Sequence, residues 1–152
     1  LALTVPGVPD VYQGTELWED NLVDPDNRRP VDFASRREAL HTLQHPKIRV
    51  VHAALRLRRE RPLTFLAGGH TALLGDGGAA EHLVAFLRGD DVLVAVTRWT
   101  VALAETGWGE TTLAIPAGVW RDRLTGATHS GTVAAAGLFA DLPVALLECS
   151  DA

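Results

Sequence analysis

The sequence predicts an α+β fold in which a mainly helical first part is followed by an antiparallel β-sandwich. Two segments, residues 34–44 and 46–61, carry apolar residues at the spacing of amphipathic helices. Beyond residue 69 the pattern changes to short alternating runs separated by turn residues, which is typical of a sandwich. We therefore expect one unit over residues 1–65 and a second over residues 66–152.

The composition describes a folded, mildly acidic protein. Of its 152 residues, 47% are hydrophobic, which is enough for a core in one or two compact units. The formal charge is −5 and the arginines lie among carboxylates, so nucleic acid is not indicated and a neutral ligand such as a sugar fits better. The longest apolar runs, such as residues 92–96, are far shorter than a membrane span.

The single cysteine, Cys149, excludes an internal disulfide and favours a cytoplasmic setting. The first residues lack the pattern of a signal peptide. The sequence starts abruptly with an apolar segment at Leu1 and contains no methionine. We therefore expect a fragment of a longer protein.

The first unit is expected to begin with a short buried strand over residues 1–12, in which prolines and a glycine interrupt an apolar stretch. A long polar loop follows, and loops of this length are often functional. Residues 24–27, Asp-Pro-Asp-Asn, are a strong turn signal, and Asp32 is a candidate cap of the first helix. Pro46 suits the first position of the second helix, which Pro62 ends.

The second unit is expected to contain several short strands with hairpin turns between them. Gly89-Asp90 and Thr125-Gly126 supply suitable turn residues. The candidate strands are Thr71–Leu74, His82–Arg88, Val92–Arg98, Thr111–Ile115, Trp120–Leu124 and Val144–Glu148.

Two residue groups suggest metal or nucleophile chemistry, and both have simpler explanations. His41 and His45 are four residues apart in sequence expected to be helical, which is a metal-ligand spacing, but no third ligand is evident. Cys149 lies in an apolar strand and is expected to be a core residue. We therefore expect no metal and no cofactor.

Aromatic and acidic residues of the long loop are candidates for a sugar site. Aromatic rings stack on the C–H groups of a pyranose, and Trp18 is as compatible with a ligand cleft as with packing. Trp99, Trp108 and Trp120 are expected in the core or between sheets. Most carboxylates of the first unit are expected to be charged loop residues or caps rather than an acid–base pair; they are Asp10, Glu16, Glu19, Asp20, Asp24, Asp26 and Asp32.

Residues 7–16, Gly-Val-Pro-Asp-Val-Tyr-Gln-Gly-Thr-Glu, resemble the stretch at the eighth barrel strand of α-amylase-family enzymes. The longer runs over residues 6–18 and 22–32 resemble more specifically the maltooligosyltrehalose synthases of glycosyl hydrolase family 13. The likeness continues through residues 55–62, 82–86 and 142–147, and so covers nearly the whole chain. It implies the last strand and helices of a TIM (β/α)8 barrel over residues 1–65 and a C-terminal β-sandwich over residues 66–152.

The resemblance implies an intramolecular transglucosylation, catalysed by an isomerase of trehalose biosynthesis. The reducing-end α-1,4 bond of a maltooligosaccharide becomes the α,α-1,1 bond of a trehalose unit. Retention of configuration requires a carboxylate nucleophile and a carboxylic acid about 5 Å apart. In the family, these two groups and a transition-state-stabilising aspartate follow barrel strands four, five and seven, which would precede Leu1. The resemblance therefore assigns no catalytic residue to this chain, and we expect the chain to be inactive alone.

The resemblance assigns a part of the cleft wall to this chain, because active sites of such barrels form at the C-terminal ends of the strands. Arg28 and Arg29 are candidates to orient the catalytic carboxylates or to donate to sugar hydroxyls. Equally, residues 24–29 can form a rigid turn that locks the loop. The candidate substrate-binding residues are Tyr12, Gln13, Glu16, Trp18, Asp24, Asn27, Arg28 and Arg29.

The expected partners are a maltooligosaccharide and the missing N-terminal part of the barrel. A barrel strand without neighbours exposes edges and apolar surface, which predicts self-association of the fragment. Two alternatives stay open. One is another α-amylase-family glucanotransferase or hydrolase, against which residues 24–32 argue. The other is a non-catalytic module that binds glucan or is only structural.

Overall fold

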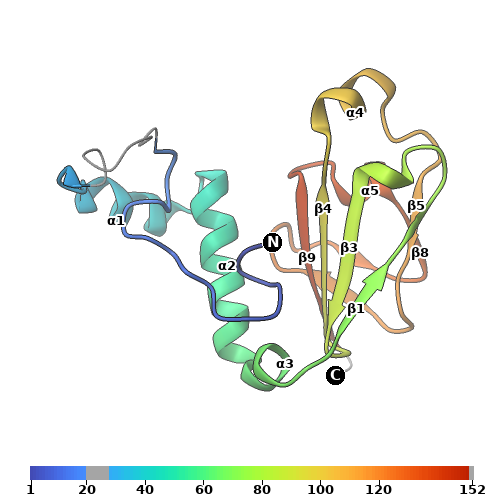
Figure 1. Ribbon diagram of the computed structural model, residues 1–152, viewed down its shortest axis with the longest axis horizontal. Coiled ribbons are helices and arrows are strands. Elements are labelled where there is room, and N and C mark those ends of the chain that lie inside the picture. Colours follow the sequence, from blue (N-terminus) through green and yellow to red (C-terminus); the bar gives the residue numbers. More distant parts are fainter. Residues whose placement is uncertain (20–27, 151–152) are drawn as a thin grey trace.

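The computed structural model describes residues 1–19 and 28–150, in which a helical part lies beside a β-domain (Figure 1). In the described part of the chain, no helix has the length and apolar character that crossing a bilayer requires. The helical part contains α1 (Phe33–Thr42), α2 (Pro46–Glu60) and α3 (Pro62–Leu66). The β-domain also holds the 3-10 turn η2 (Ala80–His82) and the helices α4 (Thr100–Thr106) and α5 (Ala135–Leu138).

Two antiparallel sheets form the β-domain. The larger sheet has the strand order β1-β3-β4-β9-β6-β7, and the smaller has the order β2-β5-β8. The strands of the larger sheet are β1 (His70–Leu73), β3 (Leu83–Arg88), β4 (Val92–Thr97), β6 (Trp120–Asp122), β7 (Thr128–His129) and β9 (Val144–Cys149). Those of the smaller sheet are β2 (Gly75–Asp76), β5 (Thr112–Ala114) and β8 (Thr132–Ala134).

Strand β4 takes part in two apolar cores, one on each face of the larger sheet. Successive side chains of a strand point to opposite faces. Leu93 and Ala95 belong to the core that includes Leu113 of β5, whereas Val94 belongs to the core that includes Leu57 of α2. The larger sheet is therefore a middle layer between the smaller sheet and α2.

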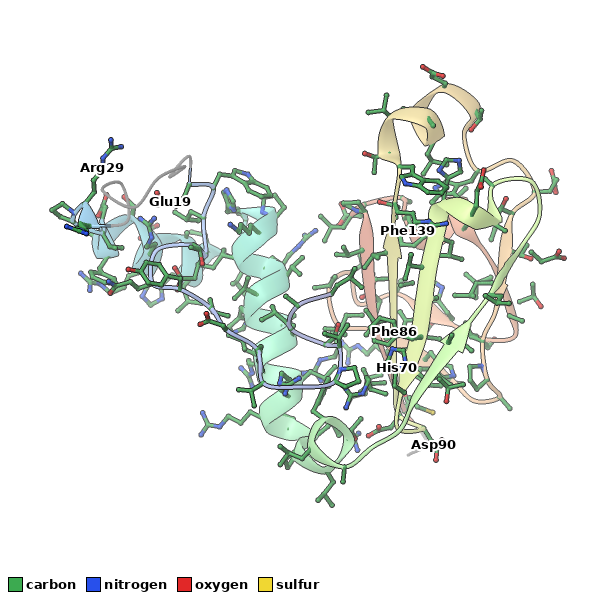
Figure 2. All side chains as sticks on the ribbon, in the orientation of Figure 1. Glu19, Arg29, His70, Phe86, Asp90 and Phe139 are labelled. Carbon is green, nitrogen blue, oxygen red and sulfur yellow. The ribbon has the colours of Figure 1, made fainter. Side chains whose placement is uncertain are left out.

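The expected α+β composition with antiparallel strands is confirmed. Both expected helices and all six expected strands are present, with ends that differ by one or two residues. The hairpin at Gly89-Asp90 joins β3 to β4, and Asp90 lies at its tip (Figure 2). The sequence analysis did not find the short strands β2, β7 and β8 or the short helices α3, α4 and α5.

The expected strand over residues 1–12 is wrong, because this segment consists of turns and irregular chain. A strand pairs its N–H and C=O groups with neighbouring strands, and this segment pairs with no described strand. Its carbonyls accept from arginines instead: Arg58 donates to Leu3 O and to Gly7 O, both at 3.1 Å. Leu3 and Val5 pack on the core between the larger sheet and α2.

The spacing of His41 and His45 does not produce a metal site. Helix α1 ends at Thr42, Leu43 takes a left-handed conformation, and His45 is the N-cap of α2, so the two histidines do not share a helix. Over the described ranges, no group of three or more His, Cys, Asp or Glu side chains is arranged to hold a metal.

Arg88, at the end of β3, places a buried guanidinium among backbone carbonyls. The residue is 2% exposed. Its guanidinium donates to Thr4 O at 2.9 Å and to Phe65 O at 3.0 Å, with longer contacts to the carbonyls of residues 64, 68 and 69. Burial lowers the pKa of Arg88 below its usual value, and the nearby Arg58 adds to this effect. The N-terminal segment, α3 and β3 are therefore held by one cation.

A chain of ion pairs joins the C-terminal end of α2 to the β-domain. Arg61 donates to Glu148 at 2.8 Å, and Arg123 donates to the other oxygen of Glu148 at 2.8 Å and to Glu60 at 2.6 Å. Glu60 also accepts from Arg56 at 3.2 Å. The Arg123 hydrogen bond, followed by the one from Arg56, lowers the pKa of Glu60 below its usual value.

We predict that Arg88→Met destabilises the fold by about 2–4 kcal/mol, because buried carbonyls lose their charge-assisted donor. The free energy of unfolding in urea measures this loss. Arg121→Met is the matched control, since Arg121 is an exposed arginine on strand β6. The control is expected to change the stability by less than about 0.5 kcal/mol. Equal losses in the two variants would contradict the role of Arg88.

We also predict a pH dependence at Glu60, whose folded pKa is lowered. A carboxylate of this kind contributes stability above its unfolded pKa and loses that contribution as the pH falls through its folded pKa. Arg123→Gln is expected to raise the NMR titration midpoint of Glu60 toward the usual value. The stability difference between wild type and variant should shrink between neutral pH and about pH 3. An unchanged midpoint for Glu60 would contradict the assignment.

Candidate functional site

The start of α1 is fixed by Asp32, as the sequence predicts. Its side chain accepts from the backbone N–H groups of Ala34 and Ser35 at 3.0 and 3.1 Å. The pKa of Asp32 is lowered, chiefly by the hydrogen bond from the Ser35 hydroxyl. The cap thus sets the place where the long loop enters the helix.

Arg36, on the first turns of α1, holds the loop that precedes the helix. Its Nε and Nη2 donate to Gly14 O at 3.0 and 2.6 Å, and its Nη1 donates to Asp32 O at 3.1 Å. Nη2 also pairs with Glu19. Gly14 is required at this contact because its φ is +91°, which side chains rarely adopt.

The N-terminal end of α2 adds a second set of contacts to the same loop. Lys47 Nζ donates to Leu17 O at 3.0 Å and lies 5.2 Å from the ring centroid of Trp18. The ring of His45 is 5.6 Å from that of Trp18, centroid to centroid. Trp18 is nevertheless 69% exposed, so its ring is held at one side and open to solvent over most of its surface.

A hollow of about 350 Å³ lies between the loop and the two helices. It brings together Tyr12, Gln13 and Arg29, three of the candidate residues predicted from the sequence. Glu19 and Arg29 both lie close to α1, and Arg29 points outward (Figure 2). Lysine, arginine and carboxylate groups thus surround a polar space, which suits a ligand with many hydroxyl groups.

The other candidate residues have different positions. Glu16 lies behind Arg36, with 3.9 Å between its Oε2 and Arg36 Nε. Trp18 lies against His45 and Lys47. Arg28 is exposed and does not line the hollow. Asp24 and Asn27, with Asp20 and Asp26, lie outside the described residues, so the choice between a rigid turn and a sugar contact stays open.

Three buried polar atoms near the loop have no hydrogen-bond partner among the described residues. They are Glu16 Oε2, His45 Nδ1 and Arg49 Nε. Buried polar groups normally find partners, and each exception calls for an explanation. All three belong to the loop or to the N-terminal end of α2, and none of them lines the hollow.

An apolar groove of about 410 Å³ lies between α1 and α2, on the other side of Arg36. Phe33, Leu40 and Leu55 line it and are 51, 46 and 39% exposed. No residue of α1 is buried. The helical part therefore presents an uncovered apolar face beside the polar hollow.

Arg36, Lys47 and His45 belong to this site, and the sequence analysis missed them. One signal was present for Arg36. A cation near the start of a helix opposes the helix dipole, and α1 has no acidic residue in its first turn to compensate. Such a residue is expected to have a partner outside the helix, and Arg36 finds it in Gly14 and Glu19.

The remaining aromatic and sulfur residues have the following positions. Cys149 is buried in the core between the sheets, as expected. Trp120 is fully buried, and Trp108 stacks on Phe139 at 5.1 Å. The expectation of a packed position is wrong for Trp99, which is 57% exposed.

Fold and site together define an α+β protein whose helices and loop border a polar hollow next to an antiparallel β-domain. No protein-family model matches the chain. Over 147 residues, or 97% of its length, the chain is 67% identical to a maltooligosyl trehalose synthase of Mycobacterium tuberculosis, of which it covers 19%.

Solved structures of maltooligosyltrehalose synthases are also similar to this chain. The maltooligosyltrehalose synthase of Arthrobacter ramosus matches with a TM-score of 0.90 and 46% identity, over 97% of this chain and 21% of that one. A maltooligosyl trehalose synthase structure from Sulfolobus tokodaii matches with a TM-score of 0.65 and 32% identity, over 96% and 19%. The chain is therefore a homologue of the maltooligosyl trehalose synthases, spans about a fifth of their length, and matches their C-terminal region.

We predict that Arg36→Lys loosens the loop, because lysine lacks the planar fork that contacts Gly14 O and Glu19 together. Hydrogen exchange of the amides in residues 12–19 is expected to accelerate at least about fivefold, as for the loss of about 1 kcal/mol of local stability. Arg37→Lys, on the exposed neighbouring position, is the control. Equal exchange rates in the two variants would exclude Arg36 as the anchor.

Proposed function

We propose that this chain is the C-terminal part of an intramolecular transglucosylase. The complete enzyme, an isomerase of trehalose biosynthesis, converts the reducing-end α-1,4 bond of a maltooligosaccharide to an α,α-1,1 bond. The observation that carries the proposal is the identity of 67% over 147 residues to a protein named maltooligosyl trehalose synthase. We further propose that the enzyme acts in the cytoplasm.

In this proposal the polar hollow is one wall of the sugar cleft. Arg29, Tyr12 and Gln13 present donors and acceptors to the same space, as sugar hydroxyls require. The exposed ring of Trp18, held from one side by Lys47, offers an apolar surface for the C–H groups of a glucose unit. Asp24, Asn27 and Arg28 complete the proposed set, and Glu16 supports it through Arg36.

The carboxylates of the chemical step are proposed to lie outside this chain. Retaining transfer needs two carboxyl groups about 5 Å apart on either side of the anomeric carbon. Two described carboxylates of the loop are engaged elsewhere: Asp32 caps α1 and Glu19 pairs with Arg36. The guanidinium of Arg29 would then hold a sugar hydroxyl or a carboxylate supplied by the rest of the enzyme.

The uncovered apolar face supports a larger assembly. Phe33, Leu40 and Leu55 expose much of their surface in the groove between α1 and α2. We propose that residues 1–65 are the end of a (β/α)8 barrel and that the preceding barrel segments pack against this groove. In their absence, the same face would promote self-association of the chain.

A chimera tests the proposed function. We expect the Mycobacterium tuberculosis homologue to keep its activity when its matching residues are replaced by this chain, and the isolated chain to have none. Disappearance of reducing ends during incubation with maltopentaose measures the reaction. Arg28→Ala or Arg29→Ala in the chimera should lower kcat about ten- to a hundredfold, as for the loss of about 1.5–3 kcal/mol in the transition state.

The control in the same chimera is Arg121→Ala, on the β-domain, which should change neither kcat nor the melting temperature. A folded but inactive chimera would overturn the proposed function. Full turnover of both arginine variants, or loss only in step with unfolding, would mean that the loop is scaffold and not cleft wall.

A further inference from the structure

Trp99 is an exposed aromatic residue in an unusual backbone conformation. It connects β4 to α4, at the end of the β-domain where α4 projects (Figure 1). Its φ and ψ are 50° and 48°, in the left-handed region that bulky side chains rarely adopt. Leu43, the other described non-glycine residue with positive φ, simply ends α1. Trp99 is the N-cap of α4, but its side chain makes no capping hydrogen bond.

The ring of Trp99 is held in place before any ligand arrives. The guanidinium carbon of Arg98 lies 4.0 Å from the ring centroid. Arg98 is itself fixed, because its Nε donates to Glu81 O and its backbone N–H donates to His82 O at 2.9 Å. The buried ring of His82 meets that of Trp99 nearly perpendicularly, at 6.0 Å between centroids.

The exposed part of this ring lies on a shallow, open surface formed by Trp99 and the following residues of α4. Thr100 and Glu105 contribute a hydroxyl and a carboxylate, and Val101, which is 79% exposed, contributes an apolar side. A fixed aromatic surface next to hydrogen-bonding groups matches a sugar ring, whose C–H groups stack on the aromatic face while its hydroxyls bond at the edge.

We propose that Trp99, with Glu105 and Thr100, forms an accessory saccharide-binding site on the β-domain, separate from the hollow beside α1. Its ligand is a gluco-oligosaccharide, bound by stacking of one glucose unit on the indole and by hydrogen bonds to the Glu105 carboxylate. The choice of an α-1,4-linked glucan rests on the proposed function, whereas the site itself rests on the geometry around Trp99. Such a site would hold a long substrate near the enzyme without taking part in the reaction.

The experiment follows the four indole N–H signals of the 152-residue chain by NMR during titration with maltohexaose. We expect the signal of Trp99 to shift saturably. Trp99→Gly should weaken the affinity at least tenfold and keep or raise the melting temperature, because glycine adopts a positive φ without strain. Glu105→Gln should weaken binding by a smaller factor, and Arg121→Ala, at an exposed position on β6, should leave it unchanged.

Several outcomes would overturn the proposal. A Trp99 signal that stays unchanged up to the solubility limit of the sugar excludes the site. The same holds if only Trp18 shifts, which locates binding in the hollow beside α1. If the Trp99 signal shifts with protein concentration in the absence of sugar, the surface is a contact between copies of the chain. The chimera tests the enzyme separately, so either proposal can fail while the other stands.

Discussion

The structure depends on one buried cation. The guanidinium of Arg88 is surrounded by backbone carbonyls, among them those of Thr4 and Phe65, and no described carboxylate bonds to it. A buried charge is costly unless hydrogen bonds replace its hydration, so the carbonyls must stay where they are. Because they belong to the N-terminal segment and to α3, the same constraint fixes two segments that contribute no strand to either sheet.

Helix α2 connects this buried cation to the candidate site, because one end of the helix packs near Arg88 and the other end carries Lys47. Phe65 and Leu57 pack in the core between α2 and the larger sheet. Arg123 holds the C-terminal end of α2 through its ion pair with Glu60. A helix of 15 residues is a rod of about 22 Å. Fixing one end therefore positions Lys47 at the other end, where it holds the loop beside Trp18. The hollow is thus a consequence of packing on the β-domain.

The sequence predicted those helices and strands that are encoded by a pattern of neighbouring residues. A continuous apolar run is clear in residues 92–96 because both faces of β4 are buried, and Asp32 precedes α1 as a cap should. Strands β2 and β7 have two residues each, too few for a period to be visible. Residues 1–12 have the composition of a strand, but a strand needs a partner, and their carbonyls bond to arginines. The roles of Arg36 and Lys47 depend on contacts 22 and 30 residues away, which no local pattern contains.

The four tryptophans separate into two pairs with different physical roles. Trp120 is fully buried and its indole N–H donates to Pro116 O, while Trp108 stacks on Phe139, so these two stabilise the β-domain. Trp18 and Trp99 are both more than half exposed, and each has a cation near its ring. Water hydrates an exposed indole poorly, and a ring that a cation keeps in one position loses little further entropy when a ligand stacks on it. Rigidity together with exposure is therefore the reason why we propose Trp18 and Trp99, and not Trp108 or Trp120, as sugar-stacking residues.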